Sequence, residues 1–568
     1  MVKRNNWRLS GILFLSRFLE HKLLVASPFS IRVISPLVRA NTNDPQSAQV
    51  GTQKKHTILF FNNNNKMKNN DDEDPSSKQV IVGWDNNNDE EQANATDNDD
   101  EDLLEDEYCS VLDDFGCEAY EDLARNLDEK VYRWIRVEAK PDETLAHLES
   151  REDVLREIER VKSEQESYGP CQLYPRIWQQ SSIKDNDAEE VMAVNGDGPH
   201  PVASFSVLQF NALAEGLSAG PNVKTPFTID KKDKNNEEGD DNNKPKNEPG
   251  FGGFSQVSSP EVCLDFSLRR WRLLEVILGI SSVTKDHDVD SAAVATTTEG
   301  VFDILALEEI DRFRGFFAPA LRIFGYEGIF MPKAKAPGVR LGYYSDGCAL
   351  FWKTNVFKLV SEERRNFRVG NQVIILATLQ HIDTGIALVV AVSHLKAQKS
   401  ETNEKIRCRQ VEELLEVAQT TAARQAETMG LEEDIPILIM GDFNADPPAQ
   451  LSFPDSSVRR ALSNHLEGAN KNGNDTTSKT PHRKFQSAYP IDPPKDSFFT
   501  TWKTRGTQTV KRIIDYIFYS SGGQKGERLQ CTENLSVPKF EELEESKLPG
   551  LRYPSDHLMI GAKFQLFK

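Results

Sequence analysis

The chain has 568 residues, a formal net charge of −20 at pH 7 and an apolar fraction of 38%. That length is too great for one ordinary domain, and no apolar run approaches the roughly 18 to 20 residues of a membrane-spanning helix. The seven cysteines are scattered without a Cys-x-x-Cys pair, which argues against a disulfide scaffold or a structural zinc site and suits a reduced compartment.

Residues 1–40 are rich in Lys, Arg and large apolar side chains and contain a single acid, Glu20. An arginine-rich, acid-poor, amphipathic start is typical of an organelle transit peptide. We therefore expect a transit peptide over residues 1–40 that directs the protein to mitochondria, with a plastid as the second choice. The alternative is a disordered basic tail on a cytoplasmic protein.

Residues 41–107 form an Asn-, Asp- and Glu-rich tract, which we expect to be disordered because it offers too little apolar surface to offset the entropy of ordering. Residues 108–200 are predicted to be an accessory helical region. Its clearest element is a charged helix over Asp142–Ser167 with apolar residues along one side. This helix either packs on the main domain or binds a partner.

From residue 201 to the C-terminus, short apolar strands alternate with helices. The predicted strands are Phe205–Phe210, Phe302–Leu307, Cys348–Trp352, Val373–Ile382, Ile386–Ser393, Ile435–Met440, Ile513–Tyr519 and Leu558–Phe567. The predicted helices are Leu268–Ile280, Arg312–Phe324 and Glu401–Thr428. Asp383-Thr384-Gly385 is expected to close a hairpin, and polar stretches near 230–250 and 467–483 are expected to be surface insertions. Strands that are apolar on both faces, mixed with hairpins and helices, indicate an α/β sandwich with sheets buried under helices.

Polar side chains fall repeatedly where these strands begin or end. They are Asn211, Glu308, Glu309, His394, Asp442, Asn444, Asp515, Asp556 and His557. Such positions would gather the side chains at one edge of a sandwich, where rigid elements often present catalytic groups. The set is rich in hard oxygen ligands and lacks a thiolate, which favours Mg²⁺ or Mn²⁺. Together with the histidines, it indicates metal-assisted hydrolysis of a phosphate ester.

Each of these residues also has a simpler interpretation. An Asp or Asn after a strand is often only a helix cap or a turn former, and a lone buried histidine is more often structural than catalytic. Asp515 is harder to explain in that way, because burying a carboxylate inside a strand without a partner is costly.

Seven segments occur in the order of the motifs of the endonuclease/exonuclease/phosphatase superfamily, which residues 202–568 resemble. The segments are Val207–Asn211, Leu307–Asp311, Asp346–Cys348, His394–Lys396, Gly441–Asn444, Ile514–Tyr516 and Ser555–His557. Within the superfamily the resemblance is greatest to the nocturnin group, which is related to the Ccr4-type deadenylases. The resemblance implies a DNase I-like fold of two mainly antiparallel or mixed β-sheets flanked by helices, and a Mg²⁺ cofactor that Mn²⁺ can replace.

The resemblance also implies a role for each matching residue. Those implied at the metal are Glu309, Asn211 and Asp556; those implied in catalysis are Asp442, Asn444, His557, Asp515 and His394; those implied to contact substrate are Asn211, Lys333, Lys396 and Lys511. The chain departs from the group where Glu308 replaces Gln, Gln398 followed by Lys399 replaces Arg, and Lys511 followed by Arg512 replaces Arg. Since Lys lacks the bidentate fork of Arg, these changes bear on substrate preference more than on catalysis.

Two enzymatic functions follow from this resemblance, and a third hypothesis is of another class. The preferred one is hydrolysis of the 2′-phosphate of NADP⁺ or NADPH, because Lys333 and Lys396 match the nocturnin pattern. The second is trimming of an adenylate-rich RNA 3′ end by a 3′→5′ exoribonuclease, for which Lys503, Arg505, Lys511 and Arg512 are the best candidate track, although they also fit a solvated hairpin edge. The third is an inactive scaffold, which the retention of the metal and base residues disfavours.

Overall fold

The computed structural model describes residues 135–181, 200–220, 225–226, 251–254, 256–283, 300–432, 434–463, 483–494, 497–521, 528–543 and 547–568. The chain divides into two units, Met1–Gln92 and Ala93–Lys568, and every described residue belongs to the second. The predicted transit peptide, the acidic tract and the insertion near 230–250 lie outside the described residues, as does all of 467–483 except Arg483.

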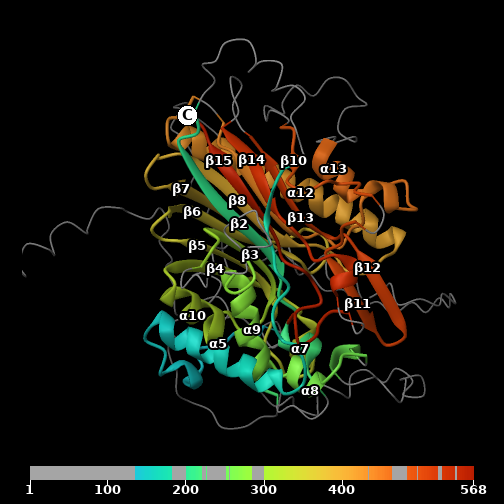
Figure 1. The fold of residues 1–568 in the computed structure, drawn as a ribbon. Coiled ribbons are helices and arrows are strands. Elements are labelled where there is room, and N and C mark those ends of the chain that lie inside the picture. The colour runs from blue at the N-terminus through green and yellow to red at the C-terminus, as the bar shows by residue number, and fades with distance from the viewer. Residues whose placement is uncertain are drawn as a thin grey trace, which may run out of the picture. The chain divides into compact units, whose positions relative to one another are not determined.

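Two β-sheets form the centre of this unit (Figure 1). The first has seven strands in the order β1 (Trp178–Gln180), β14 (Leu529–Leu535), β15 (Ile560–Leu566), β2 (Ala203–Asn211), β3 (Ile304–Ile310), β5 (Gly347–Lys353) and β4 (Tyr326–Pro332). Only the β2–β3 pair in this sheet is parallel. This is the mixed, mainly antiparallel arrangement that the sequence predicts.

The second sheet has six strands and again one parallel pair, β8–β9. Its order is β10 (Gln486–Ser487), β13 (Asp515–Ser520), β9 (Ile437–Asp442), β8 (Ala387–His394), β7 (Val373–His381) and β6 (Phe357–Asn366). The turn at Asp383–Gly385 joins β7 and β8 as an antiparallel hairpin, as predicted. A separate hairpin pairs β11 (Thr501–Arg505) with β12 (Gln508–Arg512).

Helices cover the outer face of each sheet. Beside the first sheet lie η1 (Glu143–Leu145), α5 (Arg151–Glu166), α9 (Phe266–Leu278), the π-helical turn η4 (Phe313–Phe317) and α10 (Ala318–Ile323), and beside the second lie α12 (Glu401–Thr428) and α13 (Ser457–Ser463). The shorter elements are α7 (Glu215–Ser218), η3 (Phe251–Gly253), α8 (Pro260–Cys263), α11 (Pro337–Arg340), η5 (Pro448–Gln450) and η6 (Phe540–Glu542). In the described residues no helix combines the length and apolar character needed to cross a membrane.

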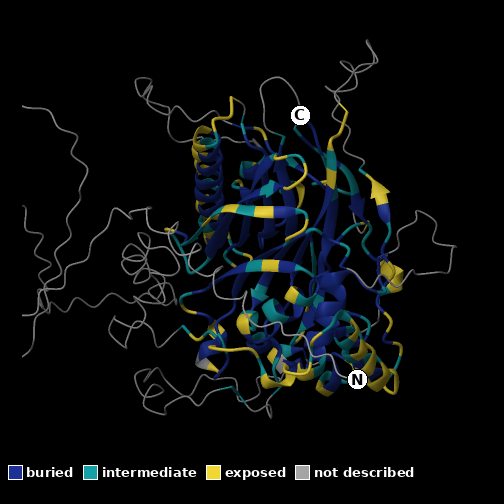
Figure 2. Cartoon of the chain, turned by 90° about the vertical axis from the view of Figure 1, so that its left-hand side faces the viewer, coloured by how far each residue is buried: buried dark blue, intermediate teal, exposed yellow. Residues whose placement is uncertain are grey.

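Strand alternation explains why this arrangement has three buried apolar layers. Figure 2 shows that the strands in the interior are mostly buried. Along β3, Leu305 and Leu307 pack against the helices, whereas Ile304 and Ala306 face the second sheet. Because successive strand side chains point to opposite faces, a strand apolar on both faces must be covered twice. The protein is therefore an α/β sandwich with helix, sheet, sheet and helix layers, the DNase I-like arrangement expected from the resemblance.

The charged helix of the accessory region begins later than predicted, at Arg151. Ser150 accepts a hydrogen bond from the Asp153 amide, and Asp153 accepts one from the Ser150 amide, so the two form a capping box that fixes this start. Ile158 and Val161 are buried in the same apolar cluster as α9. The helix is thus part of the core of the main domain.

Candidate active site

Strand pairing brings the predicted side chains to one edge of the sandwich. Asp442 at the end of β9 lies opposite His394 at the end of parallel β8 and opposite Asp515 at the start of antiparallel β13. In the first sheet, Asn211 ends β2, and His557 shortly precedes β15, which runs antiparallel to β2. Two sheets thus contribute polar groups to one buried cluster.

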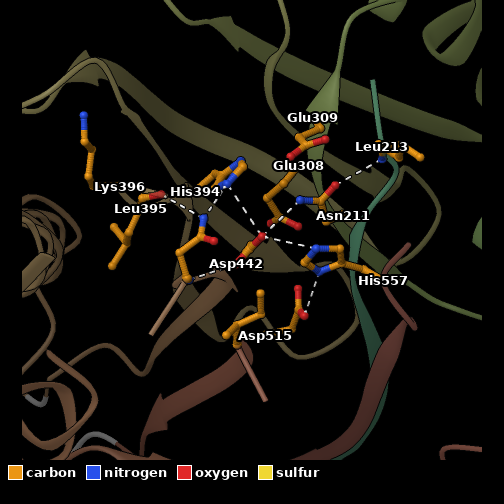
Figure 3. A network of polar contacts seen from close by, with 12 residues as sticks. Asn211, Leu213, Glu308, Glu309, His394, Leu395, Lys396, Asp442, Asp515 and His557 are labelled. Atoms are coloured by element: carbon orange, nitrogen blue, oxygen red, sulfur yellow. Dashed lines mark hydrogen bonds and ion pairs between the residues drawn. The ribbon is translucent and has the colours of Figure 1, made fainter. Parts of the chain in front are cut away.

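Asp442 lies at the centre of this cluster (Figure 3). Its Oδ2 accepts a hydrogen bond from Asn211 Nδ2 at 3.0 Å and its Oδ1 accepts one from the Asn444 amide at 2.8 Å. The same Oδ2 lies 3.6 Å from His394 Nε2 and 3.8 Å from His557 Nε2. Burial and the neighbouring Asp515 raise the pKa of Asp442 to about 6. A carboxylate with such a pKa is suited to accept a proton near neutral pH.

The two histidines have opposite protonation preferences. His557 Nδ1 lies 2.9 Å from Asp515 Oδ2; burial favours neutral His557, but Asp515 and Asp442 outweigh burial and raise its pKa to about 9. Burial, followed by Lys333, lowers the pKa of His394 well below its usual range. At neutral pH the site therefore holds one imidazolium and one neutral imidazole, a division that suits acid–base chemistry.

Asn444 is oriented by its neighbours so that one oxygen remains available. Its Nδ2 contacts His394 Nε2 at 2.8 Å and donates to the Leu395 carbonyl at 3.1 Å. Its own backbone carbonyl accepts from Arg512 Nη2 at 2.8 Å. With both amide hydrogens engaged, the Oδ1 is the part of the side chain that can accept a hydrogen bond from a water molecule.

The backbone is strained at several positions in or just after these strands. Glu309, inside β3, has a φ of 55°, and Leu213, Gln398 and Asn444, which follow strands, have φ values of 58°, 71° and 51°, in the left-handed region that non-glycine residues rarely adopt. Such residues persist where the surrounding structure enforces them, and they cluster at functional sites. Their position around one cluster supports a functional role for this edge.

Glu308 and Glu309 lie within the register shift between Leu307 and Ile310 in the pairing of β3 with β5, and they occupy different surroundings. Glu308 is fully buried and accepts a 2.7 Å hydrogen bond from Gln209 Nε2, which also donates to Asp515 at 3.0 Å. Burial and the charge of Asp515 raise the pKa of Glu308 well above its usual range. Glu309 is partly exposed, and its carboxylate accepts a 3.4 Å hydrogen bond from the Ala214 amide.

The donor set fits a hard divalent cation. Glu309 and Asp442 offer carboxylate oxygens and Asn211 offers an amide oxygen, which are ligands that Mg²⁺ accepts while it keeps several waters. Among the described residues, the group of three acidic or histidine side chains close enough to share an ion is Asp442, Asp515 and His557. Asp515 and His557, however, already engage each other through a hydrogen bond.

The structure places Asp556 with cations. Its Oδ2 accepts hydrogen bonds from Lys503 Nζ at 2.5 Å and from Arg505 Nη2 at 3.2 Å. Burial opposes ionisation, but Lys503, His557 and Arg505 hold the pKa of Asp556 below its usual range. Its role as a metal ligand, implied by the resemblance, remains a prediction.

The three lysines predicted to contact substrate occupy different places. Lys333 is buried with its Nζ 2.6 Å from Asp346; burial disfavours its charge, but Asp346 and Glu309 outweigh burial and raise its pKa. Lys396 follows His394 and extends to one side of the network in Figure 3. The Lys511 ammonium lies over the rings of Phe540 and Trp502, at 4.6 and 5.6 Å from their centroids.

The two basic residues that stand one position beyond the group's arginines meet at one carboxylate. Lys399 Nζ lies 2.8 Å from Asp446 Oδ2, and Arg512 Nε donates to Asp446 Oδ1 at 2.6 Å. Both charges therefore lie beside the Asp442–Asp446 segment, and they stabilise a carboxylate there.

Sequence reasoning missed two kinds of contributor. Arg269 on α9 is fully buried and donates to the carbonyls of Ala212, Leu213 and Pro554, so it ties the segment after β2 to the segment before β15. Lys503, expected only as part of a track for RNA, also lies 3.4 Å from His557 Nε2.

Comparison with known proteins agrees with this geometry. Residues 267–557 match the Endonuclease/Exonuclease/phosphatase family. The chain is 32% identical to Nocturnin of Mus musculus over 275 residues, which cover 46% of this chain and 54% of that protein. It is 25% identical to the CCR4-Not complex 3′-5′-exoribonuclease subunit Ccr4 of Saccharomyces cerevisiae over 343 residues, which cover 55% of this chain and 36% of that protein.

The chain spans about half the length of the Nocturnin sequences it matches. Among solved structures, it is similar to the human Nocturnin catalytic domain with bound sulfate anion, at 25% identity and a TM-score of 0.39. That alignment covers 65% of this chain and 95% of the human domain.

Proposed function

Because the chain belongs to the Endonuclease/Exonuclease/phosphatase family, we propose that it is a Mg²⁺-dependent phosphoesterase that removes the 2′-phosphate of NADP⁺ or NADPH. The observation that carries this proposal is the buried network in which Asn211, His394, Asp442, Asp515 and His557 meet from two sheets. An inactive scaffold would have no need to maintain so many buried polar groups in contact, since such groups are costly to bury.

Each residue of the network has a defined task in ester hydrolysis. Asp442 accepts a proton from the attacking water, and Asn444 orients that water through its Oδ1. His557, kept protonated by Asp515, donates a hydrogen bond to the phosphate and stabilises the negative charge that develops there. His394 is neutral, so its imidazole serves as a hydrogen-bonding partner.

Glu309, with Asn211 beside it, would hold the metal ion of this metal-dependent family, and Asp556 is the further ligand that the resemblance implies. When bound, Mg²⁺ polarises a phosphoryl oxygen as a Lewis acid. The preference for Mg²⁺ rests on the oxygen-only donor set and on the absence of cysteine from the described site residues.

The resemblance to the nocturnin group and the position of Lys333 support NADP(H) as the substrate. Lys333 is buried beside Asp346, and the charge of Glu309, the proposed metal carboxylate, helps to raise its pKa. The relatives named Ccr4 are 3′-5′-exoribonuclease subunits, and one feature of this chain favours that second candidate activity. The partly exposed Phe540 stacks on Trp502 at 4.2 Å beside Lys511, an arrangement on which a nucleobase can stack.

The deciding experiment measures phosphate release from NADPH by the purified full chain with Mg²⁺, beside a 3′-labelled oligoadenylate. We expect NADPH to lose its phosphate while the oligonucleotide stays intact, and we expect Asp442→Asn to lose this activity. Oligonucleotide shortening with NADPH unchanged would replace the phosphatase by an exoribonuclease. Wild-type protein inactive on both substrates would contradict the proposal.

A further inference from the structure

Hairpin β11–β12 places two cations over the catalytic histidine. Leu558 donates its amide to the Thr500 carbonyl at 2.7 Å, and Thr501 Oγ1 donates to the Asp556 carbonyl at 2.7 Å, so β11 lies alongside the segment that carries His557. Lys503 and Arg505, two residues apart on one strand, share a face, whereas Trp502 packs into the core on the other.

Lys503 and Arg505 together carry two positive charges, but both pair with the one negative charge of Asp556. Lys503 and Arg505 both contact a single oxygen of Asp556, which leaves one positive charge uncompensated within this group. The Asp556 side chain is 2% exposed, whereas those of Lys503 and Arg505 are 20% and 39% exposed. The surplus charge therefore faces the open side of the site.

Arg505 is fixed in place by contacts of the residue and its neighbour with the segment 251–254. Its guanidinium lies 4.4 Å from the centroid of the Phe254 ring, and the neighbouring Gly506 amide donates to the Gly253 carbonyl at 2.8 Å. Arg505 Nε is buried and has no acceptor among the described residues, so a ligand can reach this guanidinium only through its Nη groups. A cation that is held in place before binding favours an anionic ligand.

The distance between Lys503 Nζ and His557 Nε2 suits a single phosphate oxygen bound by both. Lys503 Nζ and His557 Nε2 are 3.4 Å apart, so one phosphate oxygen can accept hydrogen bonds from both at ordinary lengths of about 2.8 Å. Arg505 lies beyond Lys503 on the same face, where its fork can take a second oxygen. Three donors with two permanent charges match the terminal oxygens of a dianion better than a monoanionic diester.

We propose that Lys503 and Arg505 form a subsite that binds the terminal oxygens of a phosphate monoester and so select monoesters over internal phosphodiesters. This inference rests on the proposed function for its placement beside the reacting phosphate. Lys503 and Arg505 would then determine the specificity of that site. They would favour NADP(H), which carries a phosphate monoester, over RNA, which carries diesters.

The test is direct binding by the full chain with Mg²⁺ present, using inorganic phosphate as the monoester probe and dimethyl phosphate as the diester probe. Calorimetry on wild type, Lys503→Gln and Arg505→Lys should show at least about a tenfold loss of phosphate affinity in each variant, the size of one charge-assisted hydrogen bond. Dimethyl phosphate affinity should change by less than about twofold. Lys358→Ala, which removes an exposed charge from β6, is the matched control and should bind like wild type.

The binding measurement is independent of turnover, so it judges the subsite even if NADPH proves not to be the substrate. Unchanged phosphate affinity in both folded variants would overturn the proposal, and equal losses for the two probes would overturn the selection of monoesters. Arg505→Lys keeps the charge opposite Asp556, so it gives a result even if Lys503→Gln fails to fold. With NADPH as substrate, both variants should raise KM by about the same factor as they weaken phosphate binding.

Discussion

Asp515 controls the protonation of the site through a single contact with His557. Removing this charge lowers the pKa of His557, because Asp515 is the main group that outweighs the cost of burying the imidazolium. The effect on activity must depend on pH, since protonated His557 is needed and low pH supplies the proton without Asp515.

Asp515→Asn should reduce kcat/KM by about 100-fold at pH 8, the lower end of an acid–base contribution, and by less at pH 6. In wild type the loss of activity at high pH should fall near the His557 pKa of about 9, and in the variant it should move to lower pH. A pH profile of kcat/KM measures this shift. A loss of equal size at every pH would argue against the proposed role of His557.

Several site residues were predictable from sequence because they interrupt apolar runs. Asp442 and Asp515 are carboxylates in otherwise buried strands, and such residues need partners. Lys511 shows the limit of this reasoning. Lys511 pairs with Trp502 across the hairpin and lies over Phe540, whereas Lys503 faces the site. Which of the two lysines faces the site depends on how the hairpin packs, and the sequence does not show that packing. Arg269 was hidden for a related reason, since a buried cation within a helix looks like any solvent-facing position.

At the scale of elements, the predicted strands and helices that proved correct are those with continuous apolar sequence, such as β8, β9 and α12. Several strands were missed, among them β4 and β6. β4 contains Gly328, which resembles a turn signal, but a side chain there would clash with the ring of Phe351. β6 includes Glu362–Arg365, which suggests a surface loop, yet it forms the edge of the second sheet. Both segments form strands because of how they pack in the folded protein, and the sequence alone does not show this packing.

The packing of α5 makes a prediction about its contribution to stability. Ile158→Ala should lower the free energy of unfolding by about 2–5 kcal/mol, because it leaves a cavity in a tightly packed cluster. Arg156→Ala on the exposed face of the same helix should stay within about 0.5 kcal/mol of wild type. Urea denaturation measures both, and similar small effects would show that α5 is only loosely attached.

At the scale of the whole described unit, the candidate site lies where the two sheets meet. Glu309 and Asn211 belong to the first sheet, whereas Asp442 and His394 belong to the second. A metal ion held by Glu309 and Asn211 would bind only the folded protein, so its binding should stabilise the fold as well as activate the enzyme.

Mg²⁺ at 100 times its dissociation constant should raise the free energy of unfolding of wild type by about 2.7 kcal/mol. Glu309→Gln should lose both this stabilisation and turnover while remaining folded without metal. Glu327→Gln, at an exposed position of β4, should keep both. Thermal unfolding with and without Mg²⁺ gives the answer, and equal stabilisation of Glu309→Gln would show that the metal binds elsewhere.

The hydrogen bonds from Asn211 to Asp442 and from His557 to Asp515 each cross from one sheet to the other. The site is therefore sensitive to the relative position of the two sheets. If one sheet slid slightly along the other, Asp442 would move away from Asn211, and Asp515 would move away from His557. The apolar side chains packed between the sheets thus keep the catalytic groups of the two sheets in register. A change in packing between the sheets should therefore reduce turnover under conditions in which the protein is still folded.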